Sequence, residues 1–222
     1  MCPKRESGPV PSEFDLQAWL AGTTVLPPIV QAGDLVLRQR AREVPAALLG
    51  TPELHSLVSI MIEAMRRAPG VGLAAPQIGV PLRLFVAEDQ EERIEQIPAE
   101  AREERGRVAL PLKVLVNPSV VADGKEQVTF YEGCLSVRGY GALVTRANAV
   151  RVSGTDHEGH EVSLRLEGWP ARIMQHEMDH LEGTLYVDRM LTRSFASEGE
   201  LARLSSEPVS EVLDELVAPP KR

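Results

Sequence analysis

The sequence predicts an α+β fold in which mixed or antiparallel β-sheets pack around a central helix that carries an H-E-x-x-H motif. Apolar, β-favouring segments fill the middle of the chain, and helical patterns lie on both sides of them. The chain has 222 residues and 43% hydrophobic content, enough for one sizeable core. We expect a single domain over 1–222, with an N-terminal arm (1–26), a core (27–192) that includes a charged insertion (89–107), and an acidic C-terminal tail (193–222).

The segment 51–70, TPELHSLVSIMIEAMRRAPG, has the features of an amphipathic helix. It opens with a threonine cap followed by proline and ends in two arginines and a glycine. His55 lies off the apolar stripe, and we interpret it as a surface histidine. The residues at helical spacing that we expect to face the core are Leu54, Leu57, Val58, Met61, Ile62 and Met65.

Composition and alternation predict strands at 82–88, 112–120, 127–133, 142–154 and 161–166. A turn with the sequence DHEGHE joins the last two segments. Its His157 and His160 lie at what we expect to be an exposed, mobile hairpin tip, which makes them poor ligand candidates. The insertion 89–107 is densely charged, and we expect a solvated excursion that is partly helical or mobile.

Charge and composition exclude several classes of protein. The formal net charge is −8 and basic residues are dispersed among acidic ones, which argues against a nucleic-acid-binding surface. No apolar run approaches the ~20 residues of a membrane span, and the start lacks the apolar stretch of a secretory signal. The two cysteines, Cys2 and Cys134, suggest a reducing compartment without a structural disulfide.

The stretch RIMQHEMDHLEG holds two of the five histidines. On a helix, positions four apart share one face, so His176 and His180 aim at one point with Glu177 beside them. This pattern is typical of a catalytic metal site with an adjacent general base. The alternative is a helix surface on which two histidines meet by chance. We expect the helix to begin at 168–170, around a proline, and to end at Gly183.

A third ligand is needed, and Cys134 is the better candidate. It lies between Gly133 and Leu135 at the end of a predicted strand, and two histidines, a thiolate and a water make an open tetrahedral site. An isolated cysteine is more often a small buried apolar residue. Zincin-type peptidases instead take a glutamate about 20 residues downstream, which leaves Glu198 and Glu200 as an alternative.

The segment GVGLAAPQIGVP, which begins at Gly70, is rich in small residues. Its glycines allow the backbone to approach a ligand closely. Gln77 is a polar side chain among small and apolar neighbours, suited to donating a hydrogen bond to an oxyanion. Taken alone, a glutamine in this setting would more often be a structural amide.

GVGLAAPQIG, EGCLS and QHEMDHLEG together resemble the three motifs of peptide deformylase, in the same order. The similarity extends to VLVNPS and to IVQAGDLVLRQRAREV, where the family often has proline and this chain has Leu35. It covers about residues 27–192. The insertion 89–107 is more similar to longer members of the family, including organellar ones.

The resemblance implies a single catalytic domain with one divalent metal held by Cys134, His176 and His180. Fe(II) is the expected native metal, and zinc, nickel or cobalt are possible substitutes. The reaction implied is hydrolysis of the N-formyl group of formylmethionine on new polypeptides. Glu177 would move the proton between water and the leaving amine. The Gln77 amide, with the Leu135 backbone N–H, would hold the oxyanion.

By the same resemblance, Val71, Gly72 and Gly133 line the methionine pocket or pair with the peptide as an added strand. The implied partners are N-formylmethionyl nascent peptides, with transient proximity to the ribosome. Residues 194–219 carry six acidic residues and one arginine, so we expect no direct binding of nucleic acid. The bacterial cytoplasm is the expected location, with an organellar matrix as the alternative. The competing functions are a zincin-type endopeptidase and a structural zinc domain with a fourth protein ligand.

Overall fold

The computed structural model describes residues 14–204 and 209–217. Its strands are β1 (Gly72–Ala74), β2 (Leu84–Asp89), β3 (Leu110–Ala122), β4 (Gln127–Cys134), β5 (Val137–Ala147), β6 (Ala149–Thr155), β7 (Glu161–Glu167) and β8 (Ala196–Ser197). Its helices are α1 (Leu16–Gly22), α2 (Pro52–Arg67), α3 (Glu91–Ile94), α4 (Ala99–Glu104), α5 (Gly168–Leu181), α6 (Glu198–Leu204) and α7 (Val209–Val217). Short 3-10 turns occur at Leu35–Arg38, Ala46–Leu48, Ala75–Ile78, Tyr186–Asp188 and Thr192–Ser194.

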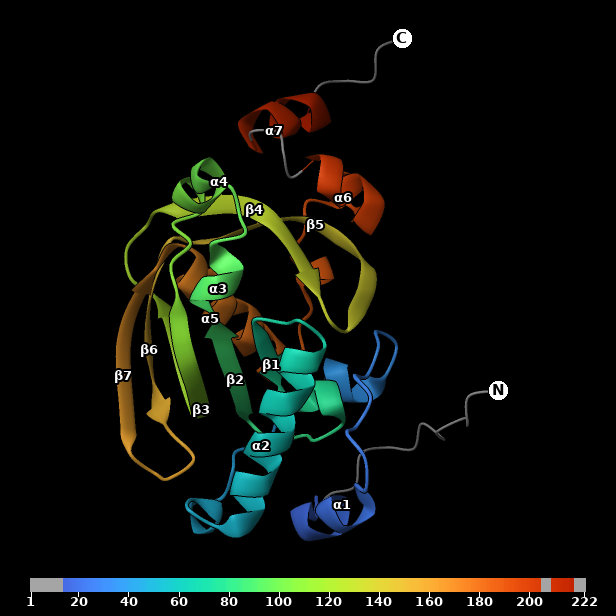
Figure 1. Ribbon diagram of the computed structural model, residues 1–222, viewed down its shortest axis with the longest axis vertical. Coiled ribbons are helices and arrows are strands. Elements are labelled where there is room, and N and C mark those ends of the chain that lie inside the picture. The colour runs from blue at the N-terminus through green and yellow to red at the C-terminus, as the bar shows by residue number, and fades with distance from the viewer. Residues whose placement is uncertain (1–13, 205–208, 218–222) are drawn as a thin grey trace.

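Two antiparallel sheets enclose the central helix α5 (Figure 1). The larger sheet has five strands in the order β1-β2-β3-β6-β7, and the smaller has three in the order β4-β5-β8. Helix α5 contacts β1, β2 and β3 of the larger sheet and β5 of the smaller one. The α+β prediction, with antiparallel sheets around the motif-bearing helix, is therefore confirmed.

The predicted strands are present, with differences at their ends. The segment expected at 142–154 is the end of β5 followed by β6, with a break at Asn148. The sequence pattern did not reveal β1 and β8, which have three and two residues and are too short for an alternation to be visible. Residues 1–13 of the expected arm, with 205–208 and 218–222 of the tail, lie outside the described residues. None of the helices in the described ranges is long and apolar enough to cross a membrane.

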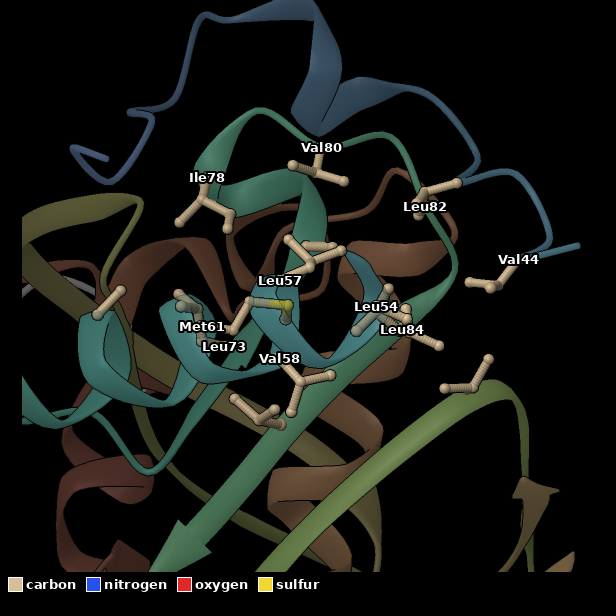
Figure 2. Close-up of a cluster of buried hydrophobic side chains, with 14 of the residues drawn as sticks. Val44, Leu54, Leu57, Val58, Met61, Leu73, Ile78, Val80, Leu82 and Leu84 are labelled. Carbon is tan, nitrogen blue, oxygen red and sulfur yellow. The ribbon is translucent and has the colours of Figure 1, made fainter. Parts of the chain in front are cut away.

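Helix α2 begins and packs as its sequence predicts. The Thr51 hydroxyl accepts a hydrogen bond from the backbone N–H of Leu54 at 3.3 Å, which satisfies one of the unpaired donors of the first turn. The predicted apolar stripe is buried except for Ile62, which is half-buried. Figure 2 shows Leu57 and Met61 of this stripe among side chains from β1, β2 and the segment between them, including Leu73, Ile78, Val80 and Leu84.

Most of the charged insertion is exposed, as expected, but two of its arginines anchor it to the rest of the protein. It contains α3 and α4, so the expectation of partial helix is correct. However, the Arg93 side chain donates to the carbonyl oxygen of Gly70 at 2.9 Å. Arg107 pairs with the fully buried Asp89 at 2.8 Å. A buried carboxylate needs such a partner, and the pair therefore holds both ends of the insertion together.

The turn between β6 and β7 is also more ordered than expected. The Asp156 carboxylate accepts hydrogen bonds from the backbone N–H groups of Glu158 and His160, both at 2.9 Å. The N–H of Gly50, just before α2, donates to the carbonyl oxygen of His157 at 2.8 Å. His160 is exposed, as predicted, whereas His157 is half-buried against the start of α2.

Leu57→Ala is expected to lower the free energy of unfolding by about 2–5 kcal/mol, because a fully buried leucine loses its contacts and leaves a cavity. Urea unfolding followed by circular dichroism measures the change. Ser59→Ala, at an exposed position of the same helix, is the matched control and should change stability by less than about 0.5 kcal/mol. Equal stability of the two variants would contradict the assignment of this face to the core.

Candidate metal centre

Helix α5 brings the two motif histidines together inside the protein. Its boundaries agree with the predicted ones: Gly168 has φ +64 where the helix begins, and Gly183 has φ +73 just after its end. The rings of His176 and His180 lie 5.1 Å apart, centroid to centroid, at an angle of 76°. Glu177 is buried between the helix and β1.

Cys134 completes a three-residue cluster. Its Sγ lies 3.3 Å from His180 Nε2, and the ligand atoms of Cys134, His176 and His180 all lie within 4.8 Å of one another. The pairing of β4 with β5 is irregular between Gly133 and Cys134, and such a bulge redirects the side chain that follows it. Within residues 14–204 and 209–217, neither Glu198 nor any fourth donor joins this cluster.

The donor set fits a divalent transition metal. One thiolate and two imidazoles suit zinc or Fe(II), and three protein ligands leave one tetrahedral position open. Glu177 Oε2 is buried and has no hydrogen-bond partner among the described residues. Because a buried polar atom without a partner is costly, this oxygen marks the place where a water or a substrate group would belong.

A buried carboxylate orients the first histidine. Glu132 Oε2 accepts a hydrogen bond from His176 Nδ1 at 2.9 Å, which leaves Nε2 for the metal. Arg146 donates to both oxygens of Glu132, at 2.6 and 2.8 Å, and Arg172 donates to one of them at 2.7 Å. Burial alone would raise the pKa of Glu132, but hydrogen bonds from Arg146 and His176 hold that pKa well below its usual range.

The same network of ion pairs extends to Asp179 on α5. Arg146 donates to Asp179 at 2.8 Å, and Arg189 makes two further bonds to it, both at 2.8 Å. Glu132 and Asp179 are not among the site residues that the sequence predicted. Glu132 lies in YEGCLS and Asp179 in HEMDH, within two of the motifs. An acidic residue inside a motif expected to be enclosed could have indicated a role in the site.

Glu177 occupies an apolar position next to the cluster. Burial raises the pKa of its carboxyl to about 7, because the charged form loses its hydration. Gly72 on β1 packs directly against it: a Cβ at that position would lie 2.6 Å from Glu177 Cδ. The glycine is therefore required for the carboxyl to sit where it does.

Gln77 makes the contacts of a structural amide and places its donor end near the cluster. Its Oε1 accepts a hydrogen bond from the N–H of Ala74 at 2.8 Å, as a structural amide does. Its Nε2 donates to Ser136 Oγ at 3.2 Å and lies 3.6 Å from Cys134 Sγ. The first bond fixes the amide so that its donor end points toward the cluster.

The residues singled out in the sequence meet at one cavity of about 630 Å³. Val71, Gly72, Gly133, Leu135 and His176 all line it, whereas His180, which lies beside Cys134, is not among its lining residues. Glu198 and Leu201 of α6 also line this cavity. The sequence suggested Glu198 only as an alternative metal ligand, and its place in the cavity lining is an additional finding.

The Polypeptide deformylase family pattern matches residues 26–195 of this chain. Peptide deformylase 1A, chloroplastic/mitochondrial, of Arabidopsis thaliana is 47% identical over 79% of the chain and 65% of the relative. Peptide deformylase 1 of Streptomyces coelicolor is 49% identical over 82% of the chain and 81% of the relative. The chain spans less than two thirds of the length of the plant relatives that it matches.

The fold is shared with solved structures as well. A crystal structure of the class I type b peptide deformylase from Acinetobacter baumannii superposes with a TM-score of 0.66 at 32% identity, covering 75% of this chain and all of that one. The resemblance of the three motifs is thus supported across the chain and in three dimensions. Taken with the cluster beside the cavity, these matches show that the chain belongs to the polypeptide deformylase family.

Proposed function

We propose that this protein hydrolyses the N-formyl group of N-terminal formylmethionine on newly synthesised polypeptides and releases formate. One observation carries the proposal: Cys134, His176 and His180 form a three-donor cluster beside a cavity that Glu177 also lines, and Glu177 Oε2 is buried without a hydrogen-bond partner among the described residues. Membership of the deformylase family supports the same reaction.

Cys134, His176 and His180 would hold the metal of this metal-dependent family, and we propose Fe(II) as the native ion, with zinc, nickel or cobalt as substitutes. Such an ion, when bound, supplies Lewis acidity that lowers the pKa of a coordinated water toward neutrality. Glu132 would keep the His176 ring in the ligating tautomer through its bond to Nδ1.

The protein's own groups would then move the proton and hold the developing charge. Glu177 accepts a proton from the attacking water while the water oxygen adds to the formyl carbon. It then passes this proton to the amine nitrogen as the C–N bond breaks. A carboxyl with a pKa of about 7 is suited to both steps. The Gln77 amide and the Leu135 backbone N–H would donate to the formyl oxygen as it becomes negative.

Strand β1 offers a place for the peptide. It is the edge strand of the five-stranded sheet, so the backbone groups on its outer side have no strand partner among the described residues. Val71 and Gly72 at this edge line the cavity, and so do Gly133 and Leu135. A substrate would add to β1 as an extended strand and place its methionine side chain among these apolar groups.

For partners and location we propose nascent formylated peptides in the bacterial cytoplasm. The bacterial relative from Streptomyces coelicolor is 49% identical and the chloroplastic/mitochondrial one from Arabidopsis thaliana 47% identical. Any contact with the ribosome would be transient, because the stretch 194–219 carries six acidic residues and one arginine.

The proposed reaction is tested by measuring formate release from formyl-Met-Ala-Ser beside cleavage of an internal peptide bond in a longer unformylated peptide. We expect the first and not the second. Internal cleavage without formate release would indicate a zincin-type endopeptidase. Stoichiometric metal with neither activity would indicate a structural metal site.

Glu177→Gln should lower kcat by at least about 10²-fold, because the amide keeps the shape but cannot accept the proton. Metal content should stay unchanged and KM within a few-fold, as for an interaction made mainly in the transition state. Steady-state kinetics and metal analysis on the same sample measure both. The control is Glu63→Gln, an exposed pair partner of Arg67 on α2. Turnover like that of the unmodified protein would refute the proton-transfer role.

Cys134→Ala should lose most bound metal and activity together, because two imidazoles alone hold a divalent metal weakly. Cys2→Ala, at a position outside the described residues, should change neither. Metal analysis after dialysis against trace chelator checks both variants. One metal ion per chain retained in Cys134→Ala would exclude the proposed ligand set.

Gly72→Ala should slow catalysis by roughly 10- to 100-fold while metal is retained, because the new methyl group displaces the Glu177 carboxyl by about 1 Å. Gly22→Ala is the matched control, since a Cβ there meets nothing within 4 Å. A fall in metal content that parallels the fall in kcat would contradict the idea that Gly72 positions only the carboxyl.

A further inference from the structure

A second cluster of side chains that could bind a metal lies at the start of α2, whereas the first cluster lies beyond its C-terminal end. It consists of His55 from α2 with His157 and Glu158 from the β6–β7 turn, and their ligand atoms all lie within 4.8 Å of one another. The two imidazole rings are 5.0 Å apart, centroid to centroid, at 59°. His55 Nε2 is 3.0 Å from Glu158 Oε1. The three residues come from segments about 100 positions apart in the sequence.

The surroundings of the two rings point to a ligand. His157 Nδ1 is a buried atom without a hydrogen-bond partner among the described residues. His55 Nε2 is also buried, and it lies 3.0 Å from Glu158 Oε1 without the alignment of a hydrogen bond. The short distance from His55 to Glu158 is an ion pair only when the imidazole is protonated. Two inward-facing imidazole nitrogens and one carboxylate oxygen are, by contrast, a donor set that zinc uses in proteins, with a water in the fourth position.

The backbone around the cluster is already in place. The N–H of Gly50 donates to the His157 carbonyl oxygen at 2.8 Å, which ties the turn to the segment before α2. The Asp156 carboxylate fixes the turn itself through two backbone N–H groups, each at 2.9 Å. Metal binding here would therefore order few additional groups, which keeps its entropic cost small.

We propose that His55, His157 and Glu158 form a second metal site that takes zinc or a similar divalent transition metal and clamps α2 to the β6–β7 turn. The site shares no residue with the Cys134 cluster. Helix α2 continues for twelve residues beyond His55 before it ends near the catalytic cavity, a length of roughly 18 Å. The proposal does not rest on the proposed hydrolytic function.

Zinc counting on the holoenzyme tests the proposal. Protein whose catalytic site is already loaded with zinc is dialysed against low micromolar zinc, and bound zinc per chain is measured by mass spectrometry. We expect two ions in the unmodified protein and one in both His55→Ala and His157→Ala. The affinity for the second ion should fall at least about tenfold in each variant, since even residues that only orient a ligand cost 10- to 100-fold.

His160→Ala is the matched control, because this neighbouring histidine is 78% exposed and lies outside the cluster. It should keep two ions. Formate release should be the same in all four proteins, which separates this site from the catalytic one. One ion in the unmodified protein, or two in His157→Ala, overturns the proposal. The first result would leave the cluster as an ion pair between His55 and Glu158.

Whether the site clamps the fold is tested by melting temperature. Zinc added beyond the first equivalent should raise Tm in the unmodified protein and in His160→Ala, because an ion that binds only the folded state stabilises it. The same zinc should leave the Tm of His55→Ala unchanged. An equal rise in His55→Ala would show that the extra zinc acts elsewhere, and would overturn the clamp.

Discussion

The arrangement of the candidate site depends on one buried ion-pair network. Glu132 on β4, Arg146 on β5 and Asp179 on α5 are all less than a tenth exposed, and each charge is matched by an opposite one at 2.6–2.8 Å. Burying ions costs several kcal/mol each unless pairs and hydrogen bonds offset it. The network therefore tolerates only one placement of β4 and β5 on the helix. Since Cys134 ends β4 and His176 lies on α5, that placement also sets the distance between the two proposed ligands.

Small residues allow neighbouring elements to approach closely around the site. Gly141 on β5 faces the carbonyl oxygen of Glu132 on the paired strand β4, and a Cβ there would lie 2.6 Å from it. Gly72 on β1 packs in the same way against the Glu177 carboxyl of α5. Gly168 is needed for its positive φ and because the insertion packs against it: a Cβ on Gly168 would lie 3.0 Å from the Cα of Gly106. These glycines act at the contacts between elements rather than within one element.

Local patterns predicted the elements well because they depend on neighbours in the chain. The threonine cap and apolar stripe of α2, and the proline and glycines at the ends of α5, could be recognised without knowledge of the rest of the fold. Contacts between distant segments were harder to predict. The insertion 89–107 has the composition of a solvated segment, yet Arg93 donates to the carbonyl oxygen of Gly70 and Arg107 pairs with the fully buried Asp89. Composition alone does not distinguish such anchoring charges from the exposed charges around them.

The candidate site shows the same division. The proposed ligand triad was inferable because residue types with strong metal affinity stand in recognisable local spacing. Asp179 and Glu132 were overlooked because a carboxylate near a metal motif has many possible roles until its partners are known. The histidines differ in the same way: His176 and His180 are adjacent on one helix face and form a visible motif, whereas His55 and His157 meet only after β6 and β7 fold back onto the start of α2. A site built from two distant segments leaves no periodic trace in the sequence, so only the three-dimensional structure could bring it to notice.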